Sequence, residues 1–310
     1  MTRPAVARRL GEVALGMALS APITLARPLP YRWRIAVTGW LTARIVAPLA
    51  GYDRRVRDNL AHVWPDLPEA EIRHLMRAVP DQAGRSMAEL HSPTSFKARA
   101  AAARVHGPGL DHLRDARMRD RPVVFVTGHL GSFNAARLAM IAQGFDLGSF
   151  YRPMHNRWFN RRYVAAMAAL SEPIFEQGRR GMRQMLTHLG RSGAVLILTD
   201  VRAQDGVPLD FLGKPALSPL TAAKLALKFG ALLVPVWGIR GETGLDFEIL
   251  VEAPVQPDDP VSMMQVVNDR LARQVRARPD QWFWVHRRWH DGSGPLEKSA
   301  PRDVTTQARP

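Results

Sequence analysis

The stretch VVFVTGHLGSFN, residues 123–134, combines a strand, a tight turn and the start of a helix. Its first five residues are apolar or β-branched, which is typical of a strand buried on both faces of a parallel sheet. Gly128 and Gly131 allow the backbone to turn sharply and to approach a ligand, and Ser132 can cap the helix that follows. His129 therefore stands just beyond the end of a parallel strand, where open α/β sheets bind their ligands.

The residues around His129 are those of a general base. The positive N-terminal end of the following helix disfavours an imidazolium, so we expect His129 to be neutral. Asn134 lies in the first turn of that helix, and its side chain can fold back to one imidazole nitrogen. A base with an orienting partner is the arrangement that activates a hydroxyl nucleophile. Taken alone, a histidine at a strand end is more often a structural residue than a catalytic one.

Strands alternate with helices on the C-terminal side of this stretch. Further strands are predicted at residues 146–151, 173–175, 194–199 and 232–237, and helices at residues 132–140, 158–170, 181–189, 222–229 and 260–277. This alternation predicts an α/β fold with a mostly parallel sheet flanked by helices on both faces. Leu245–Val251 is predicted to add an antiparallel strand near one edge.

The front of the chain is helical and basic. Residues 1–58 hold ten arginines against three acidic residues, a net charge of +7. Leu10–Ala26 and Ile35–Gly51 are apolar but short compared with the ~20 residues that cross a bilayer. One interpretation is a membrane-surface anchor with Trp33 and Trp40 at the interface; the other is a pair of buried core helices. Residues 54–90 are predicted to form two further helices, separated at residues 64–68.

These patterns divide the chain into four parts. We expect membrane-associating helices in residues 1–52, a helical subdomain in 53–104, the α/β domain in 105–291 and a flexible tail in 292–310. The tail is polar and contains three prolines, at positions 295, 301 and 310.

Composition limits the classes of function. The 310 residues are 46% hydrophobic and 23% charged, which is globular rather than disordered composition. A net charge of +15 predicts anionic partners. There is no cysteine, which excludes disulfides, thiolate metal ligands and cysteine nucleophiles. No zinc-finger or RNP-like motif is present, so we expect no nucleic-acid partner.

Five segments, in order along residues 30–290, resemble the bacterial lipid A biosynthesis late acyltransferase family, also known as lauroyl/myristoyl acyltransferases, within the glycerolipid acyltransferase superfamily. The segments are RDNL at 57–60 with WPDL at 64–67, His129-x4-Asn134, YRPMHN at 151–156, FLGKPA at 211–216 with VPV at 234–236, and PDQWFWVHRRW at 279–289. The last segment is the most specific. Its tryptophans and arginines are interpreted as packing residues rather than catalytic ones.

The resemblance implies transfer of a fatty acyl chain from acyl-carrier protein to a hydroxyl of a phosphorylated lipid A precursor. The implied location is the cytoplasmic face of the bacterial inner membrane. His129 would take the proton from the acceptor hydroxyl, with Asn134 at the second motif position. No covalent acyl-enzyme, metal or other cofactor is implied. The net positive charge suits an acidic carrier protein, a phosphorylated acceptor and an anionic membrane surface.

The resemblance and the strand ends also suggest residues that bind substrate. Backbone amides near Gly128, Gly131 or Gly213 are candidates for stabilising the oxyanion. Arg152 is the first candidate for contacting an acceptor phosphate or sugar, and an ion pair with Asp200 or Asp205 is its structural alternative.

Two further polar residues, Asn156 and Asp200, complete the expected substrate-binding set. Asn156 ends the segment that begins with Tyr151. Asp200 follows a strand, where it could orient an acceptor or pair with Arg202.

One departure from the family pattern motivates alternatives. Asn134 replaces the carboxylate of the HxxxxD/E motif, and an amide cannot stabilise an imidazolium by charge. The chain could therefore be a catalytically weak member that binds lipid or acyl-carrier protein. A different acceptor, such as a phospholipid, an ornithine-type lipid or a glycolipid, is the other alternative, since the motifs specify the acyl transfer better than the acceptor.

Overall fold

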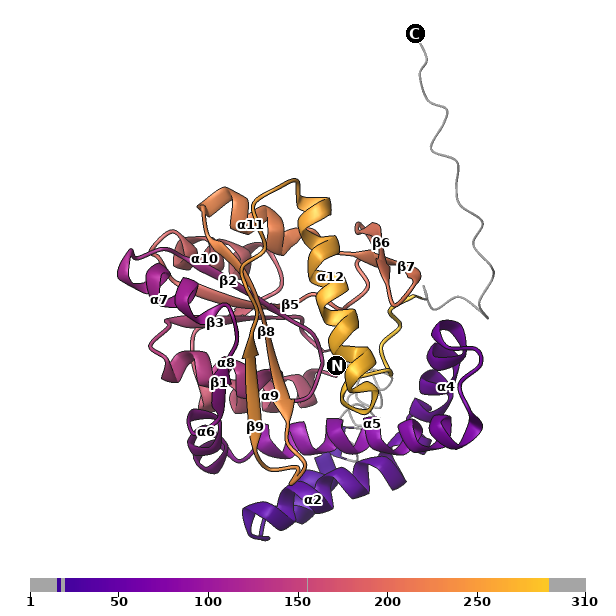
Figure 1. Cartoon of the computed structure of the whole chain (residues 1–310). Helices are drawn as coiled ribbons and strands as arrows, with labels where there is room; N and C mark the ends of the chain where they lie inside the picture. The colour runs from indigo at the N-terminus through magenta and orange to yellow at the C-terminus, as the bar shows by residue number, and fades with distance from the viewer. Residues whose placement is uncertain (1–15, 18–19, 155, 290–310) are drawn as a thin grey trace, which may run out of the picture.

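A seven-stranded sheet forms the centre of the protein (Figure 1). The structure is a computed structural model and describes residues 16–17, 20–154 and 156–289. The spatial order of the strands is β1-β9-β8-β2-β5-β3-β4. Their bounds are β1 Arg104–His106, β2 Val123–Thr127, β3 Leu147–Tyr151, β4 Ile174–Glu176, β5 Ala194–Leu198, β8 Leu232–Arg240 and β9 Phe247–Val251.

The sheet is mostly parallel, as the sequence predicts. Strands β8, β2, β5, β3 and β4 all run in one direction, while β9 is antiparallel to β8 and carries β1 in parallel at the edge. The predicted antiparallel strand is therefore confirmed as β9, one position in from the edge. The edge strand β1 was not predicted, because three residues with a single apolar side chain give no periodic signal.

Helices cover both faces of the sheet. Successive side chains along a strand point to opposite faces, and the side chains on both faces are buried here. In β2, Val123 and Phe125 pack on one helical layer, while Val124 and Val126 pack on the other. The first layer contains α6 Pro93–Ala101, α7 Leu110–Met118, α8 Phe133–Ala142 and α9 Arg157–Leu170, and the second contains α10 Arg179–Leu189, α11 Thr221–Phe229 and α12 Pro260–Ala277. A sheet covered in this way has both faces removed from water, which explains its nearly uninterrupted apolar strands.

The N-terminal helices lie along one side of this α/β body. They are α2 Tyr31–Leu41, the π-helical turn η1 Thr42–Val46, α3 Ala47–Leu49, α4 Tyr52–Val63 and α5 Glu69–Leu90. The predicted break at residues 64–68 separates α4 from α5. Helix α2 lies beside α5, in the lower part of Figure 1.

The apolar segment Ile35–Gly51 is buried on one side only. Ile35 and Ala47 are fully buried, while Trp40 is 54% exposed and Leu49 is 84% exposed. One side of the segment is therefore core and the other faces outward. Among the described residues, no single helix is long and apolar enough to span a bilayer; Tyr31–Leu49 and Tyr52–Val63 meet that criterion only together, across an 85° bend. Residues 10–15 and 18–19 of the first apolar segment lie outside the described residues, as does the predicted tail at 292–310.

A β-hairpin that the sequence analysis did not predict contains the FLGKPA segment. Strands β6 Val207–Phe211 and β7 Lys214–Ser218 pair in antiparallel register. The turn between them places Leu212 at φ 60° and Gly213 at φ 84°. Gly213 is thus an exposed turn residue, where glycine accepts the left-handed backbone without strain.

A buried ion pair connects α5 to β8. Arg240 donates to both carboxylate oxygens of Glu89, with Nη2 3.0 Å from Oε2, and its Nε lies 2.7 Å from Oε1 of Gln82. The two charged side chains are 1% and 0% exposed. The hydroxyl of Ser132, just before α8, donates to the same carboxylate over 3.1 Å. The pair therefore connects three segments at one buried point.

Removing one member of this pair should strongly destabilise the fold. We expect Glu89→Ala to lower the free energy of unfolding by about 3–5 kcal/mol, because it leaves the Arg240 charge buried and unpaired. The matched control is Arg114→Ala, which breaks the exposed Arg114–Asp111 pair and should cost at most about 1 kcal/mol. Urea unfolding of the three proteins measures both effects, and equal losses in the two variants would contradict this role for the pair.

Candidate active site

The register between β2 and β5 brings two polar residues to one edge of the sheet. Thr127 pairs with Leu198, and the amide of Thr199 donates to the carbonyl of Thr127 over 2.9 Å. The two parallel strands therefore end at the same level. His129 and Asp200, each two residues beyond its strand, lie side by side as a result.

Asp200 is fully buried and accepts three hydrogen bonds. Its Oδ1 lies 2.8 Å from Nδ1 of His129. Its Oδ2 accepts from the amide of His129 over 2.7 Å and from Nε1 of Trp282 over 2.9 Å. A buried carboxylate needs such donors, because no water can solvate its charge. The Trp282 indole is thus part of the site as well as of the core.

These contacts determine the protonation state of the pair. Burial acts to raise the pKa of Asp200, but His129 and the hydrogen bonds it donates outweigh burial and hold that pKa well below its usual range. An ionised carboxylate can only accept, so Nδ1 of His129 carries a proton. Nε2 is then the basic nitrogen, and the His129 side chain remains 26% exposed. A substrate hydroxyl can approach the pair from this side.

The turn that carries His129 is held by backbone contacts on two sides. The amide of Ser132 donates to the carbonyl of Gly238 over 2.8 Å, and the amide of Gly131 donates to the carbonyl of Gln281 over 2.9 Å. Gly131 has φ +55°, and a Cβ there would lie 2.2 Å from the Gly238 oxygen. Glycine is therefore required at this position.

Gly128 is restricted by its neighbours on the other side of the turn. A Cβ at Gly128 would lie 2.9 Å from the Leu271 side chain and 3.1 Å from Oδ2 of Asp200. Both glycines thus allow the close packing that places His129, and their contact with substrate stays a prediction.

Several of the amides proposed for the oxyanion are already engaged. Those of His129, Gly131 and Ser132 donate to protein acceptors, and the amide of Gly213 donates to Oδ1 of Asp210 over 3.1 Å. The expectation that Gly131 or Gly213 supplies a free donor is therefore not met.

Asn134 does not orient His129. Its side chain is buried in the first turn of α8, and its Oδ1 has no hydrogen-bond partner among the described residues. The imidazole nitrogen that Asn134 was expected to reach is bonded to Asp200 instead. The physical reason is the matched ends of β2 and β5, which bring a carboxylate to the ring from a neighbouring strand. The replaced motif carboxylate therefore does not leave His129 without a negative partner.

Of the other predicted site residues, Arg152 has an exposed side chain and Asn156 caps a helix. Arg152, beyond the end of β3, is exposed and forms no ion pair with any described residue, so it is not paired with Asp200 or Asp205. Asn156 caps α9, with its Oδ1 accepting from the amide of Phe159 over 2.9 Å. Asp200 is not paired with Arg202 either, since His129 and Trp282 occupy its oxygens.

A second histidine lies against His129. The rings of His286 and His129 are T-shaped, with centroids 4.2 Å apart. Nε2 of His286 is buried and has no hydrogen-bond partner among the described residues. Burial, followed by the nearby His129, lowers the pKa of His286 from 6.5 to about 3, so this imidazole is neutral at neutral pH.

Sequence reasoning assigned the segment that contains His286 to packing and gave Asp200 a role in substrate orientation. The position of Asp200 could have indicated its pairing with His129, because each residue stands two positions beyond the end of its strand. For His286 no such signal existed, since the segment beyond α12 reaches the site through long-range contacts.

His129, Asp200 and His286 are also the kind of residues that bind metals. Each offers one ligand atom, and these atoms lie within 4.8 Å of one another. Two imidazoles and a carboxylate are a common donor set for zinc. The pairing of His129 with Asp200 provides a chemical role for both that requires no ion.

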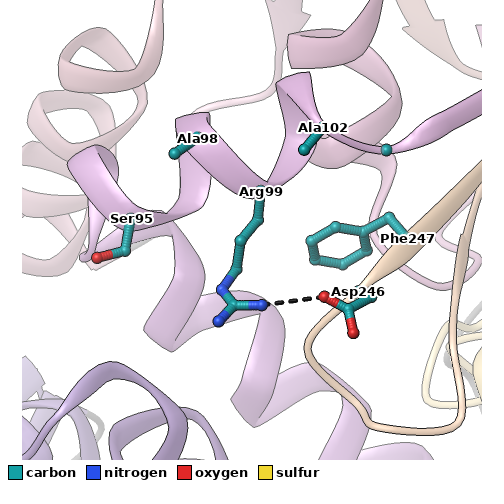
Figure 2. A pocket seen from close by; sticks show the side chains of 7 residues that line it. Ser95, Ala98, Arg99, Ala102, Asp246 and Phe247 are labelled. Atoms are coloured by element: carbon teal, nitrogen blue, oxygen red, sulfur yellow. Dashed lines mark hydrogen bonds and ion pairs between the residues drawn. The ribbon is translucent and has the colours of Figure 1, made fainter.

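A cavity of about 520 Å³ elsewhere on the protein lacks comparable chemistry. It lies between α6 and the loop before β9, and Figure 2 shows Arg99 pointing to Asp246 across it. Arg99 Nη1 is 3.0 Å from Oδ1 of Asp246, and much of the remaining lining is alanine. No base or nucleophile with an orienting partner faces this cavity among the described residues, so His129 remains the better candidate.

Comparisons with known proteins identify the family of the chain. Residues 9–291 match the family described as bacterial lipid A biosynthesis acyltransferase. The chain is 25% identical over 279 residues to a phosphatidylinositol mannoside acyltransferase of Mycobacterium tuberculosis, covering 83% of this chain and 88% of the relative.

Two further relatives have different named acceptors. A phosphatidylinositol mannoside acyltransferase of Mycolicibacterium smegmatis is 23% identical over 284 residues, covering 90% of this chain and 93% of the relative. The lipid A biosynthesis lauroyltransferase of Escherichia coli is 24% identical over 243 residues, covering 76% and 78% respectively.

The neutral state of His286 predicts a pH-dependent stability. Between about pH 5 and pH 6 the unfolded chain binds a proton at this residue and the folded chain does not, so stability should rise with pH. His286→Gln should remove up to about 1.4 kcal/mol per pH unit from that slope. Urea unfolding across this range measures the slope.

The control for this experiment is His112→Gln, which changes an exposed histidine on α7. We expect the control to keep the slope of the native protein. A slope in His286→Gln equal to that of the control would contradict the buried, neutral state of His286.

Proposed function

The chain belongs to the bacterial lipid A biosynthesis acyltransferase family, and from this we propose that it moves a fatty acyl chain from acyl-carrier protein to a hydroxyl of a phosphate-bearing glycolipid. The observation that carries the proposal is the His129–Asp200 pair at the carboxyl ends of β2 and β5. This is a base with a charged orienting partner, open to a substrate on one side.

The geometry supports a direct transfer. Nε2 of His129 takes the proton of the acceptor hydroxyl as its oxygen attacks the thioester carbonyl carbon. Asp200 stabilises the imidazolium that forms and keeps the ring in the required tautomer. When the tetrahedral intermediate collapses, the new C–O ester bond remains, the C–S bond breaks, and the proton passes to the leaving thiolate. No acyl group becomes attached to the protein in this sequence.

The sequence segments and the named relatives both support a phosphate-bearing glycolipid as the acceptor. The sequence segments suggest a phosphorylated lipid A precursor, whereas the mycobacterial relatives are named for phosphatidylinositol mannosides. Both acceptors carry hydroxyl groups and a phosphate. Arg152 is exposed at the end of β3, on the same sheet edge as His129, and a guanidinium there is suited to contacting that phosphate.

The structure favours an active enzyme over a protein that only binds lipid. The binding alternative rested on Asn134 in place of the motif carboxylate. Asp200 supplies a buried, ionised carboxylate to His129, so the argument for weak catalysis loses its basis.

We place the working position of the protein at the cytoplasmic face of the inner membrane, with α2 at the lipid surface. Trp33 and Trp40 are 53% and 54% exposed. They are seven residues apart on α2, which is about two helical turns and places them on one face. Tryptophans are favoured at the boundary between water and lipid, where an indole can be partly buried and still donate its N–H.

The proposal predicts which lipid gains an acyl chain and what removes that activity. The purified protein, given labelled acyl-carrier protein, should acylate a phosphatidylinositol mannoside, a lipid A precursor or both. His129→Ala should abolish the transfer and also lower the melting temperature, because it removes the imidazole partner of the buried Asp200 carboxylate; a far-ultraviolet circular-dichroism spectrum checks that the variant is folded. Mass spectrometry of total lipids from cells with and without the gene identifies the acceptor. Native turnover in His129→Ala would contradict the mechanism, and transfer to none of these acceptors would contradict the function.

The position of Asp200 predicts that Asp200→Asn and Asn134→Asp have different effects on the transfer rate. Asp200→Asn should lower the transfer rate by roughly 10³–10⁴-fold, because an amide cannot enforce the tautomer or stabilise the imidazolium. Asn134→Asp should give no gain in rate, since His129 already has a carboxylate partner. Steady-state rates with melting temperatures measure both variants. A faster Asn134→Asp enzyme, or an Asp200→Asn enzyme of native rate, would return the orienting role to position 134.

A further inference from the structure

A basic groove is lined by residues of α2, η1 and α5. Its volume is about 560 Å³, and its defining side chains are Trp40, Arg44, Arg73, His74, Arg77 and Arg85. Asp81 is the one acidic residue in its lining. The groove lies where α2 and α5 run beside one another in the lower part of Figure 1. We refer to it as the α2–α5 groove.

Two arginines of the groove have no acidic partner. Arg85 pairs with Asp81, and Arg73 lies 3.6 Å from Glu69. Arg44 and Arg77 are exposed and form no ion pair with any described residue. Arg73 and Arg77 also stand one turn apart on α5, a like-charge spacing that weakens a helix. The groove therefore concentrates positive charge that the described part of the fold does not neutralise.

The chemistry of these side chains matches a phosphate group. Guanidinium groups bind phosphate through paired N–H donors, and two unpaired guanidiniums that line one groove can share a single phosphate. The volume of the groove exceeds that of one phosphate, which leaves room for the group to which the phosphate is attached.

The exposed apolar side chains beside the groove favour a lipid over a water-soluble ligand. Trp40 lines the groove and is 54% exposed. Ile45 and Leu49 follow on the same N-terminal segment at 49% and 84% exposed, and Trp33 precedes them at 53%. Arginines beside an aromatic and apolar surface are the pattern of a segment that lies in the headgroup region of a membrane.

We infer that the α2–α5 groove is a second lipid site, separate from the catalytic site, that holds the phosphate of an anionic membrane phospholipid. Arg44 and Arg77 bind the phosphate, while Trp40 enters the interface beside it. The inference rests on the membrane position in the proposed function and extends it from a general surface contact to a defined headgroup site.

Helix α5 extends from the groove to the turn that carries His129. Gln82 lines the groove and accepts from Nε of Arg240. One turn further along α5, Oγ of Ser86 lies 3.4 Å from the carbonyl oxygen of Gly131. Nearly one turn beyond Ser86, the carboxylate of Glu89 accepts a hydrogen bond from the hydroxyl of Ser132. A phospholipid held in the groove would therefore set the orientation of His129 relative to the membrane surface.

The experiment compares two double variants of the full-length protein. Arg44→Gln/Arg77→Gln removes the unpaired charges of the groove. Arg191→Gln/Lys224→Gln removes two other exposed charges, one just after α10 and one on α11, two helices that lie away from α2 in Figure 1. Both variants lower the net charge by two. Binding is measured by co-sedimentation with phosphatidylcholine vesicles that contain or lack phosphatidylglycerol.

The native protein should bind the anionic vesicles more tightly than the neutral ones. The groove variant should lose roughly twentyfold in affinity for anionic vesicles and little for neutral vesicles, while the control variant stays within about threefold of native. Equal losses in the two variants would overturn the inference, because the effect would then be net charge alone. Native binding by the groove variant would overturn it as well.

Two further measurements identify the source of the phosphate and the class of partner. Inorganic phosphate alone should not raise the melting temperature of the native protein relative to the groove variant; a selective rise would assign the groove to a soluble phosphate instead. Binding to acyl-carrier protein should be native in the groove variant. Its loss together with unchanged vesicle binding would assign the groove to an acidic protein.

The inference and the proposed function can fail separately. Acyl transfer in neutral detergent micelles, where no anionic bilayer is present, should be the same in native and groove-variant proteins. Absence of transfer in every protein would contradict the proposed function and leave the vesicle result as the test of the groove. A native protein that binds neither kind of vesicle would contradict the membrane position, and the groove inference with it.

Discussion

A carboxylate with no exposed surface has to be compensated inside the protein, and Asp200 imposes this requirement on the whole site. Its donors come from the turn after β2 and from Trp282, a residue that follows the last helix of the sheet domain. Segments from the middle and the end of the chain must therefore meet before the charge is compensated. The same contacts that make the buried charge tolerable also fix the tautomer of His129, so stability and chemistry depend on one set of hydrogen bonds.

The sequence was informative wherever structure is local. The buried strand at residues 123–127 and the helix Pro260–Ala277 were predicted to the residue, because each has an uninterrupted pattern between clear boundaries. The turn at His129 was located for the same reason. What escaped prediction is long-range: the partner of His129 was expected five residues away at Asn134, whereas the actual partner, Asp200, arrives from a neighbouring strand. Hydrogen-bond partners across a sheet depend on strand order, which no local pattern contains.

The site specifies the reaction more closely than it specifies the substrate. A base with an ionised partner can act on any hydroxyl that reaches it, which is consistent with a family whose relatives are named for acceptors as different as lipid A and phosphatidylinositol mannosides. Discrimination among acceptors therefore has to come from groups around the base, such as the exposed Arg152 beyond β3. Changes at those positions can redirect an enzyme of this kind without disturbing its chemistry.

The Arg240–Glu89 pair also bears on how the protein responds to heat. Hydration of charged groups becomes less favourable as temperature rises, so the penalty for keeping this pair away from water shrinks on warming. Apolar contacts gain no comparable advantage. The attachment of α5 to the sheet, and with it the support of the turn that carries His129, should consequently be among the last tertiary contacts to loosen. Thermal unfolding would then begin in the outer helices, with the His129–Asp200 pair still assembled.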